Sequence, residues 1–104
     1  MRVIIQSPRV LAREPLLDFV RQKVGKLSEV SDLLLEARVL LKVNRSDVRE
    51  NKICEIRGII YGNDLFAEKQ ASTFEEATLK AIDAVKRQIT DLKDKQITAR
   101  PEGI

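Results

Sequence analysis

The apolar residues of this chain repeat with a helical period in two segments and with a period of two in the segments between them. Residues 16–27 and 74–92 each place apolar side chains three and four positions apart, which is typical of an amphipathic helix with one buried stripe. The remaining ordered segments alternate apolar and polar side chains, as half-buried strands do. The predicted strands are residues 2–7, 35–44, 52–61 and 65–71. The chain is therefore predicted to fold in the order β-α-β-β-β-α.

Each predicted helix has a single apolar stripe, so both helices must cover the same face of the sheet. The stripes contain Leu16, Leu17, Val20, Val24 and Leu27 in the first helix, and Phe74, Ala77, Ala81, Val85, Ile89 and Leu92 in the second. The covered sheet face is predicted to carry Leu35, Ala37, Val39, Leu41 and Val43, followed by Cys54, Ile56, Gly58 and Ile60. The result is a two-layer α+β sandwich, a four-stranded sheet with two helices packed on one face, similar to double-stranded-RNA-binding domains.

Local signals fix several boundaries. Thr73 and Glu76 have the spacing of a capping box at the start of the second helix, and residues 61–64 contain the Gly and Asn of a tight hairpin. Gly25 inside the first helix is interpreted as a site of close packing. We expect one domain over residues 1–96 and a short flexible C-terminal tail over residues 97–104.

The composition argues against catalysis. The chain has no histidine, a single cysteine at an inward strand position, and four glycines that form no phosphate-binding loop. An enzyme is therefore not expected, and neither a metal, a cofactor nor a small-molecule substrate is predicted. No leader sequence or bilayer-spanning apolar run is recognisable, so we expect a cytoplasmic protein with no membrane partner.

Charge alone does not identify a partner. The 19 basic and 16 acidic residues leave a net charge of +3, and residues 73–95 contain five of each sign. The basic side chains on the predicted helices are Lys23, Lys26, Lys80, Lys86, Arg87, Lys93 and Lys95. Their spacing by itself favours a solvated helix face with pairs such as Asp83–Arg87 over an RNA-binding surface.

The uncovered face of the sheet is the other candidate surface. It is predicted to carry Ile4, Leu40, Ile59 and Tyr61 among Arg2, Arg38, Lys42, Glu55 and Arg57. Apolar side chains on an open sheet face can form a protein-interaction surface, although cross-strand packing also explains them.

Residues 1–96 resemble the bacterial ribosome hibernation-promoting factors and ribosome-associated translation inhibitors. "LLDFVRQKVGKL", residues 16–27, is similar to that family's Leu-x-x-Phe-Val-x-x-Lys-x-x-Lys-Leu helix. "AIDAVKRQITDLKDK", residues 81–95, is similar to its Ala-x-Asp-x-x-x-Arg-Gln-Leu-x-x-x-Lys-x-Lys pattern. The short form, which lacks both a second domain and an acidic tail, is the closer comparison.

The resemblance implies a non-enzymatic protein that binds small-subunit rRNA in the mRNA–tRNA channel and silences idle ribosomes under stress or in stationary phase. It implies rRNA contacts from Lys23, Lys26, Arg87, Lys93 and Lys95, and the predicted rRNA-binding set also includes Lys80 and Lys86. We expect the free protein to be monomeric. Glu29, Asp91 and Ala84 stand where many members have lysine, whereas Lys86 stands where an acid is common, which indicates a basic patch that is relocated rather than reduced. The alternative is a protein-interaction module that uses the open sheet face, for example on the transcription apparatus.

Overall fold

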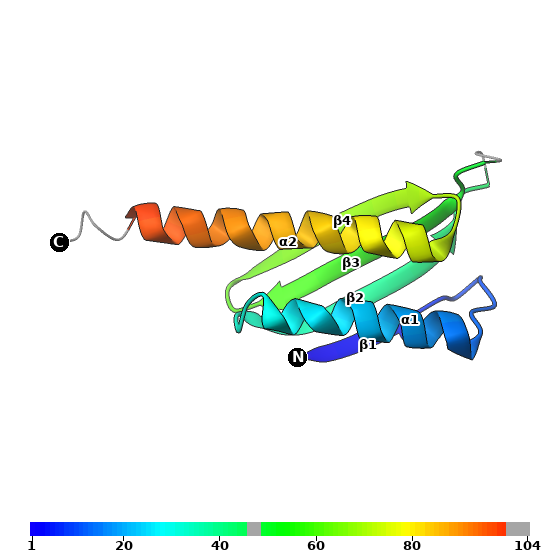
Figure 1. Ribbon diagram of the computed structural model, residues 1–104, viewed down its shortest axis with the longest axis horizontal. Coiled ribbons are helices and arrows are strands. Elements are labelled where there is room, and N and C mark those ends of the chain that lie inside the picture. The colour runs from blue at the N-terminus through cyan, green and yellow to red at the C-terminus, as the bar shows by residue number, and fades with distance from the viewer. Residues whose placement is uncertain (46–48, 100–104) are drawn as a thin grey trace.

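The computed structural model describes the backbone of residues 1–45 and 49–99 and the side chains up to residue 93. The elements follow the predicted order, with one short 3₁₀-helix added after the first α-helix. They are β1 (Arg2–Gln6), α1 (Glu14–Gly25), the 3₁₀-helix η1 (Lys26–Glu29), β2 (Leu34–Val43), β3 (Lys52–Ile60), β4 (Asn63–Ala71) and α2 (Phe74–Ala99). Figure 1 shows both helices on one face of the four-stranded sheet. The two-layer α+β architecture is confirmed.

The four strands lie in the order β1-β2-β3-β4. β1 is parallel to β2, and the other neighbouring pairs are antiparallel. A parallel pair needs a crossover connection, and α1 supplies it across the covered face of the sheet. Figure 1 shows that α1 and α2 run side by side in the same direction, so their C-terminal parts lie at the same end of the domain.

The core lies between the helices and the sheet, where the predicted stripes place it. Val20, Val24 and Leu27 from α1 and η1 are fully buried. From α2, Ala77, Ala81 and Val85 are fully buried, Phe74 and Ile89 nearly so, and Leu92 packs partly buried against them. The inward residues of β3 are buried as predicted, including Cys54 and Ile56. Sequence periodicity thus assigned the covered faces of both helices and of β3 correctly.

The prediction for the start of β2 was wrong. Leu34 is 4% exposed and belongs to the core, whereas Leu35, which was predicted to face inward, is 55% exposed. The pairing of β2 with β3 shifts register between Leu34 and Glu36. A bulge adds one residue to one strand and reverses the alternation of its side chains, so the simple period of two fails there. Val43, at the other end of β2, is 40% exposed rather than buried.

Gly25 does not mark close packing. A side chain built at this position would meet no atom within 4 Å, and α1 ends here and continues as η1. The close contact lies at Gly58 instead, where an added Cβ would come 2.9 Å from the Leu34 side chain. Absence of a side chain at Gly58 therefore lets Leu34 fill the core beside β3.

The predicted caps and turns hold at the ends of β3, β4 and α2. The Glu76 N–H donates to Thr73 Oγ1 at 3.1 Å, which is one half of the expected capping box. Gly62 has a positive φ of 86°, and β3 ends at Ile60, so Tyr61 lies in the hairpin and not in the strand. α2 continues to Ala99, three residues beyond the predicted domain boundary at 96. Residues 100–104 of the predicted tail lie outside the described residues.

Candidate RNA-binding surface

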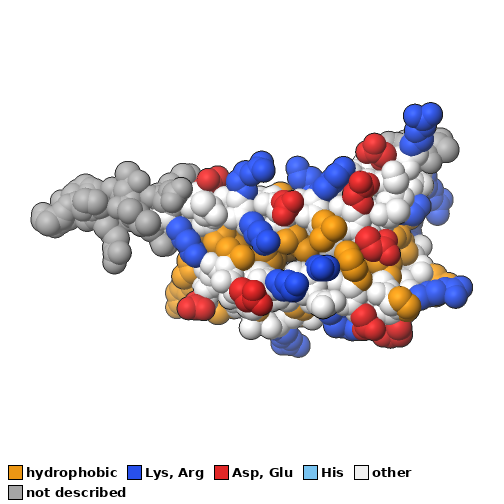
Figure 2. Space-filling view, in the orientation of Figure 1, with side chains coloured by type: hydrophobic (Ala, Val, Ile, Leu, Met, Phe, Trp, Pro, Cys, Tyr) orange, Lys and Arg blue, Asp and Glu red, His pale blue; other side chains and the backbone are white. Residues whose placement is uncertain are grey.

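Basic side chains of α1, η1 and α2 lie beside the strip of surface between α1 and α2, the helix groove (Figure 2). On α1 and η1, Phe19, Lys23 and Lys26 follow at spacings of four and three, so they share one flank beside the buried stripe. On α2, Lys86 and Lys93 are seven residues apart, which also places them on one flank. Two long-range contacts identify which flank of α2 faces α1.

The contact of Lys93 shows which flank of α2 faces α1. The Lys93 Nζ donates to the backbone carbonyl of Val30, directly after η1, at 2.6 Å. The outer flank is fixed by Gln88, whose side chain contacts the backbone of Phe66 in the edge strand β4. Lys86 therefore lies on the flank toward α1, and Arg87 and Lys80 lie on the solvent side of α2, away from the groove.

The lysine at the α1 side of the groove is held against an aromatic ring. Lys23 is half-buried, and its Nζ lies 5.8 Å from the centroid of the Phe19 ring. This arrangement covers the apolar stem of the lysine while the ammonium group stays at the surface. Lys26 begins η1 and is exposed. Figure 2 shows Lys and Arg side chains lying over a strip of apolar side chains between the helices.

The predicted RNA-binding residues thus fall into two groups. The groove group consists of Lys23, Lys26, Lys86 and Lys93, and Lys80 and Arg87 form a separate exposed pair on the outer side of α2. The side chain of Lys95 lies outside the described part of the chain. Spacing along the sequence indicated the repeats but could not show which repeat faces the other helix.

The helix face and the open sheet face differ in how many of their cations form ion pairs with carboxylates. On the sheet, Arg38 pairs with Glu36, Lys42 with Glu55 and with Glu68 at 4.0 Å, and Arg57 with Asp64 at 3.7 Å. The hydrogen bond that Lys42 donates to Glu55 raises the pKa of Lys42 above its ordinary value. Arg21 and Asp18 pair on α1 at 2.9 Å.

The candidate cations of the helix face have no such partners. Among the residues that the structure describes, none of Lys23, Lys26, Lys80, Lys86 and Arg87 forms an ion pair with a carboxylate. The predicted Asp83–Arg87 pair is therefore not formed there. These five cations are therefore free to meet an external anion, whereas Arg38, Lys42 and Arg57 on the sheet are each paired with a carboxylate.

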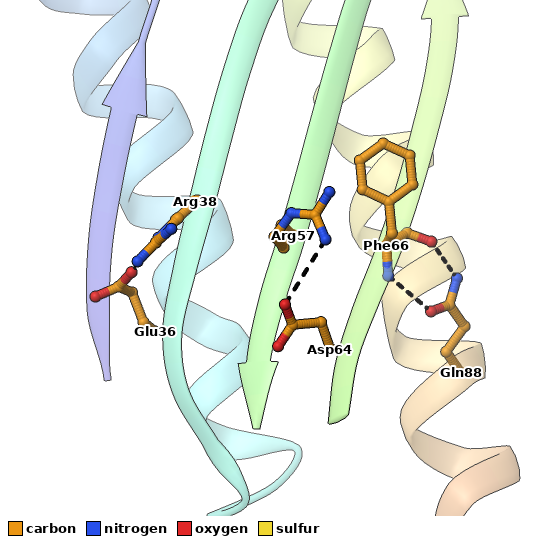
Figure 3. A network of polar contacts seen from close by, with 6 residues as sticks. All are labelled: Glu36, Arg38, Arg57, Asp64, Phe66 and Gln88. Atoms are coloured by element: carbon orange, nitrogen blue, oxygen red, sulfur yellow. Dashed lines mark hydrogen bonds and ion pairs between the residues drawn. The ribbon is translucent and has the colours of Figure 1, made fainter. Parts of the chain in front are cut away.

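The open sheet face has one prominent side chain that the sequence analysis missed. Phe66 of β4 is 41% exposed, and the Arg57 guanidinium carbon lies 5.1 Å from its ring centroid (Figure 3). The alternation that buries Leu65 and Ala67 would have placed Phe66 on this face. The predicted members Ile4, Leu40 and Ile59 are half-buried there, and Tyr61 belongs to the hairpin.

The described residues hold neither a membrane-spanning helix nor a cluster of metal ligands. No helix within residues 1–45 and 49–99 is both long enough and apolar enough to cross a membrane. Over the same residues, no three His, Cys, Asp or Glu side chains come together as the ligands of a metal ion would.

Comparison with known proteins places the chain in a family. Residues 3–97 match the family model described as Sigma 54 modulation protein / S30EA ribosomal protein. The chain is 30% identical over 101 residues to the ribosome hibernation promotion factor of Deinococcus radiodurans. The match covers 95% of this chain and 52% of that relative, so the chain spans about half of the relative's length.

Two solved structures share the fold. The N-terminal domain of Protein Y from Thermus thermophilus aligns with a TM-score of 0.72 at 20% identity, covering 88% of this chain and 99% of that one. A ribosomal subunit interface protein from Coxiella burnetii aligns with a TM-score of 0.79 at 13% identity, covering 90% and 99% respectively. With the family model spanning almost the whole folded region, this chain belongs to the Sigma 54 modulation protein / S30EA ribosomal protein family.

Proposed function

We propose that this domain binds the rRNA of the small ribosomal subunit through its helix face and holds idle ribosomes inactive. The proposed binding place is the channel that mRNA and tRNA use, so that occupancy by the domain blocks translation. The protein would act in the cytoplasm, as a monomer when free, and without catalysis or a cofactor. Support comes from the family and from the relative named as a ribosome hibernation promotion factor.

The distribution of ion pairs is the observation that carries this proposal. Binding to nucleic acid gains free energy when a protein cation replaces the counterions of a phosphate. A cation already paired with a carboxylate gains less, because the pair must be broken or its acid brought near the phosphate. Lys26 and Lys86 are exposed and unpaired within the described residues, whereas Arg38, Lys42 and Arg57 on the sheet are paired.

The two groups of basic residues suit different contacts. Lys23, Lys26 and Lys86 line the groove as point charges, which fits phosphates approaching along the two helices. Arg87, on the outer side of α2, presents a guanidinium fork that can bind one phosphate through two hydrogen bonds. Lys80 lies seven residues before Arg87 and extends the same surface. Lys95 would add a contact further along α2.

Ribosome sedimentation with a pair of variants tests the proposal. Lys26→Glu combined with Lys86→Glu should abolish co-sedimentation of the protein with small subunits, since each change removes an attraction and places an anion beside phosphate. We expect a loss of affinity of about a hundredfold, equivalent to about 3 kcal/mol. Arg38→Glu combined with Arg57→Glu on the open sheet face makes the same change of net charge, is the matched control and should co-sediment as the unmutated chain does.

The opposite result would favour the second candidate function. If the sheet variant loses binding and the helix variant keeps it, the helix face is not the RNA-binding surface. The exposed Phe66 ring under Arg57 would then be the centre of an interaction surface on the sheet. Salt separates the two directly, because RNA binding through phosphates weakens by about 0.7–0.9 log units per contact for each log unit of salt.

A further inference from the structure

A pocket lies at the end of the domain opposite η1. It is formed where the turn after β1 meets the C-terminal end of β2, and its lining residues are Pro8, Arg9, Leu40, Lys42, Val43 and Arg45. Gln6 pairs with Leu40, which brings the following turn beside the last residues of β2. The Val10 N–H donates to the Ser7 carbonyl at 3.2 Å, so Pro8 and Arg9 occupy the middle of a closed turn.

The pocket combines an apolar floor with cations at its rim. Pro8, Leu40 and Val43 supply the apolar surface. Lys42 is already engaged by Glu55 and Glu68. Arg9 and Arg45 are exposed, and neither pairs with a carboxylate in the part of the chain that the structure describes. Two guanidinium groups are therefore available beside an apolar surface.

This combination fits one nucleotide of a single-stranded nucleic acid. Each guanidinium group can bind a phosphate through two hydrogen bonds, and an unstacked base can lie on the apolar floor or against the plane of an arginine. A base-paired strand would keep its bases stacked and could use the cations only. The cations named along the helix groove are lysines, which meet phosphates as point charges, whereas this pocket offers two guanidinium groups beside an apolar floor and so suits a nucleotide.

We propose that this pocket binds a nucleotide of single-stranded RNA and gives the domain an RNA contact separate from the helix groove. The inference deepens the proposed function, and rests on it for the identity of the RNA. Figure 1 shows the β1–α1 connection at the end of the domain opposite the C-terminal part of α1, so the two contacts face different segments of RNA. Arg9 and Arg45 hold the phosphate, and Pro8, Leu40 and Val43 support the base.

The test is binding of the full chain to a labelled oligouridylate of about ten nucleotides, measured by fluorescence anisotropy. Arg9→Gln combined with Arg45→Gln should weaken binding about tenfold or more, because two charge-assisted contacts are lost. The slope of log affinity against log salt concentration should become shallower by about 0.7, corresponding to the one phosphate that the two arginines hold on a single strand. Arg2→Gln combined with Arg13→Gln removes the same charge outside the pocket and should change binding much less. Equal losses in the two variants would overturn the proposal.

Further measurements test the pocket without relying on the folding of the variants or on the proposed function. Backbone amide resonances of Arg9 and Val43 in the unmutated chain should shift when the oligonucleotide is added, and unshifted resonances would contradict the site. Polyglutamate of similar length should not bind; binding that depends on Arg9 and Arg45 would make this a site for acidic protein segments instead. If Lys26→Glu with Lys86→Glu leaves subunit binding intact while the pocket variant loses the oligonucleotide, the proposed function fails and the pocket assignment stands.

Discussion

The side chain of Gln88 pairs with the backbone of Phe66 in the way that a neighbouring strand would. Its amide nitrogen donates to the Phe66 carbonyl at 2.6 Å, and its Oε1 accepts from the Phe66 N–H at 3.1 Å (Figure 3). β4 is an edge strand, and edge strands expose backbone groups that can recruit another chain. Gln88 thus occupies one pairing position on this edge and ties α2 to it.

We expect Gln88→Ala to reduce the free energy of unfolding by about 1–2 kcal/mol, since two hydrogen bonds are lost and water can replace part of them at the surface. Urea denaturation measures this change. Thr90→Ala, at an exposed position on the same helix, is the matched control and should stay within about 0.5 kcal/mol of the unmutated chain. Equal stability of the Gln88 and Thr90 variants would show that the contact contributes nothing.

Lys93 should prove more important for stability than for RNA binding. Its ammonium group already donates to the Val30 carbonyl, so Lys93→Met should cost about 1 kcal/mol or more of unfolding free energy. Lys86→Met removes an exposed, unpaired cation and should leave stability nearly unchanged while weakening binding to small subunits. Thermal unfolding and co-sedimentation of both variants separate the roles. The reverse ranking in both assays would make Lys93 an RNA contact rather than a tie between helices.

Val85→Asp should prevent folding. Val85 is fully buried between α2 and the sheet, and a carboxylate there would have no cation to pair with in the core. The expected loss exceeds about 4 kcal/mol, a large part of the stability of a domain of this size. Circular dichroism of the purified variant should show no cooperative melting transition, whereas Thr90→Asp on the exposed side of the same helix should melt normally.

The buried thiol of Cys54 should make stability fall at high pH. Desolvation raises the pKa of this thiol from 9.0 to about 11, opposed in part by the Thr78 hydroxyl. The folded state therefore keeps the proton over a pH range in which the unfolded state releases it, so unfolding becomes easier as the pH rises from 9.0 to about 11. Cys54→Ala should lack this component, which is on the order of 2 kcal/mol. Urea unfolding of both proteins below pH 9 and near pH 11 measures the difference, and parallel curves would contradict it.

The order of elements and most of the core could be predicted from periodicity. Apolar side chains recur with a helical period on the face of α2 that covers the sheet, and with a period of two on the face of β3 that the helices cover. The prediction failed at Leu35, since a bulge is a property of strand pairing and leaves no mark on the alternation of β2 alone. Gly25 and Gly58 also show that periodicity along one segment does not reveal contacts between segments. Both are single glycines in periodic segments, and only the position of Leu34 distinguishes the one in close contact.

The candidate RNA-binding residues were predicted as a set, but their arrangement was not. The contact of Lys93 with Val30 joins residues 63 positions apart, and no spacing rule within α2 contains that information. The same holds for the division between Lys86, which faces α1, and Arg87, which faces solvent. Phe66 differs, because the alternation around it was sufficient to place it on the open face.

α2 follows all four strands in the chain, and this order determines when the domain can fold during its synthesis. Ala81, Val85 and Ile89 cover inward residues of the sheet, including Cys54 and Ile56 on β3. A nascent chain emerges N-terminus first, so these strands leave the exit tunnel before the helix that covers them has been made. Until about Ile89 has emerged, the sheet presents an uncovered apolar face, the kind of surface that binds chaperones or aggregates. Folding of this domain must therefore wait until α2 has left the exit tunnel.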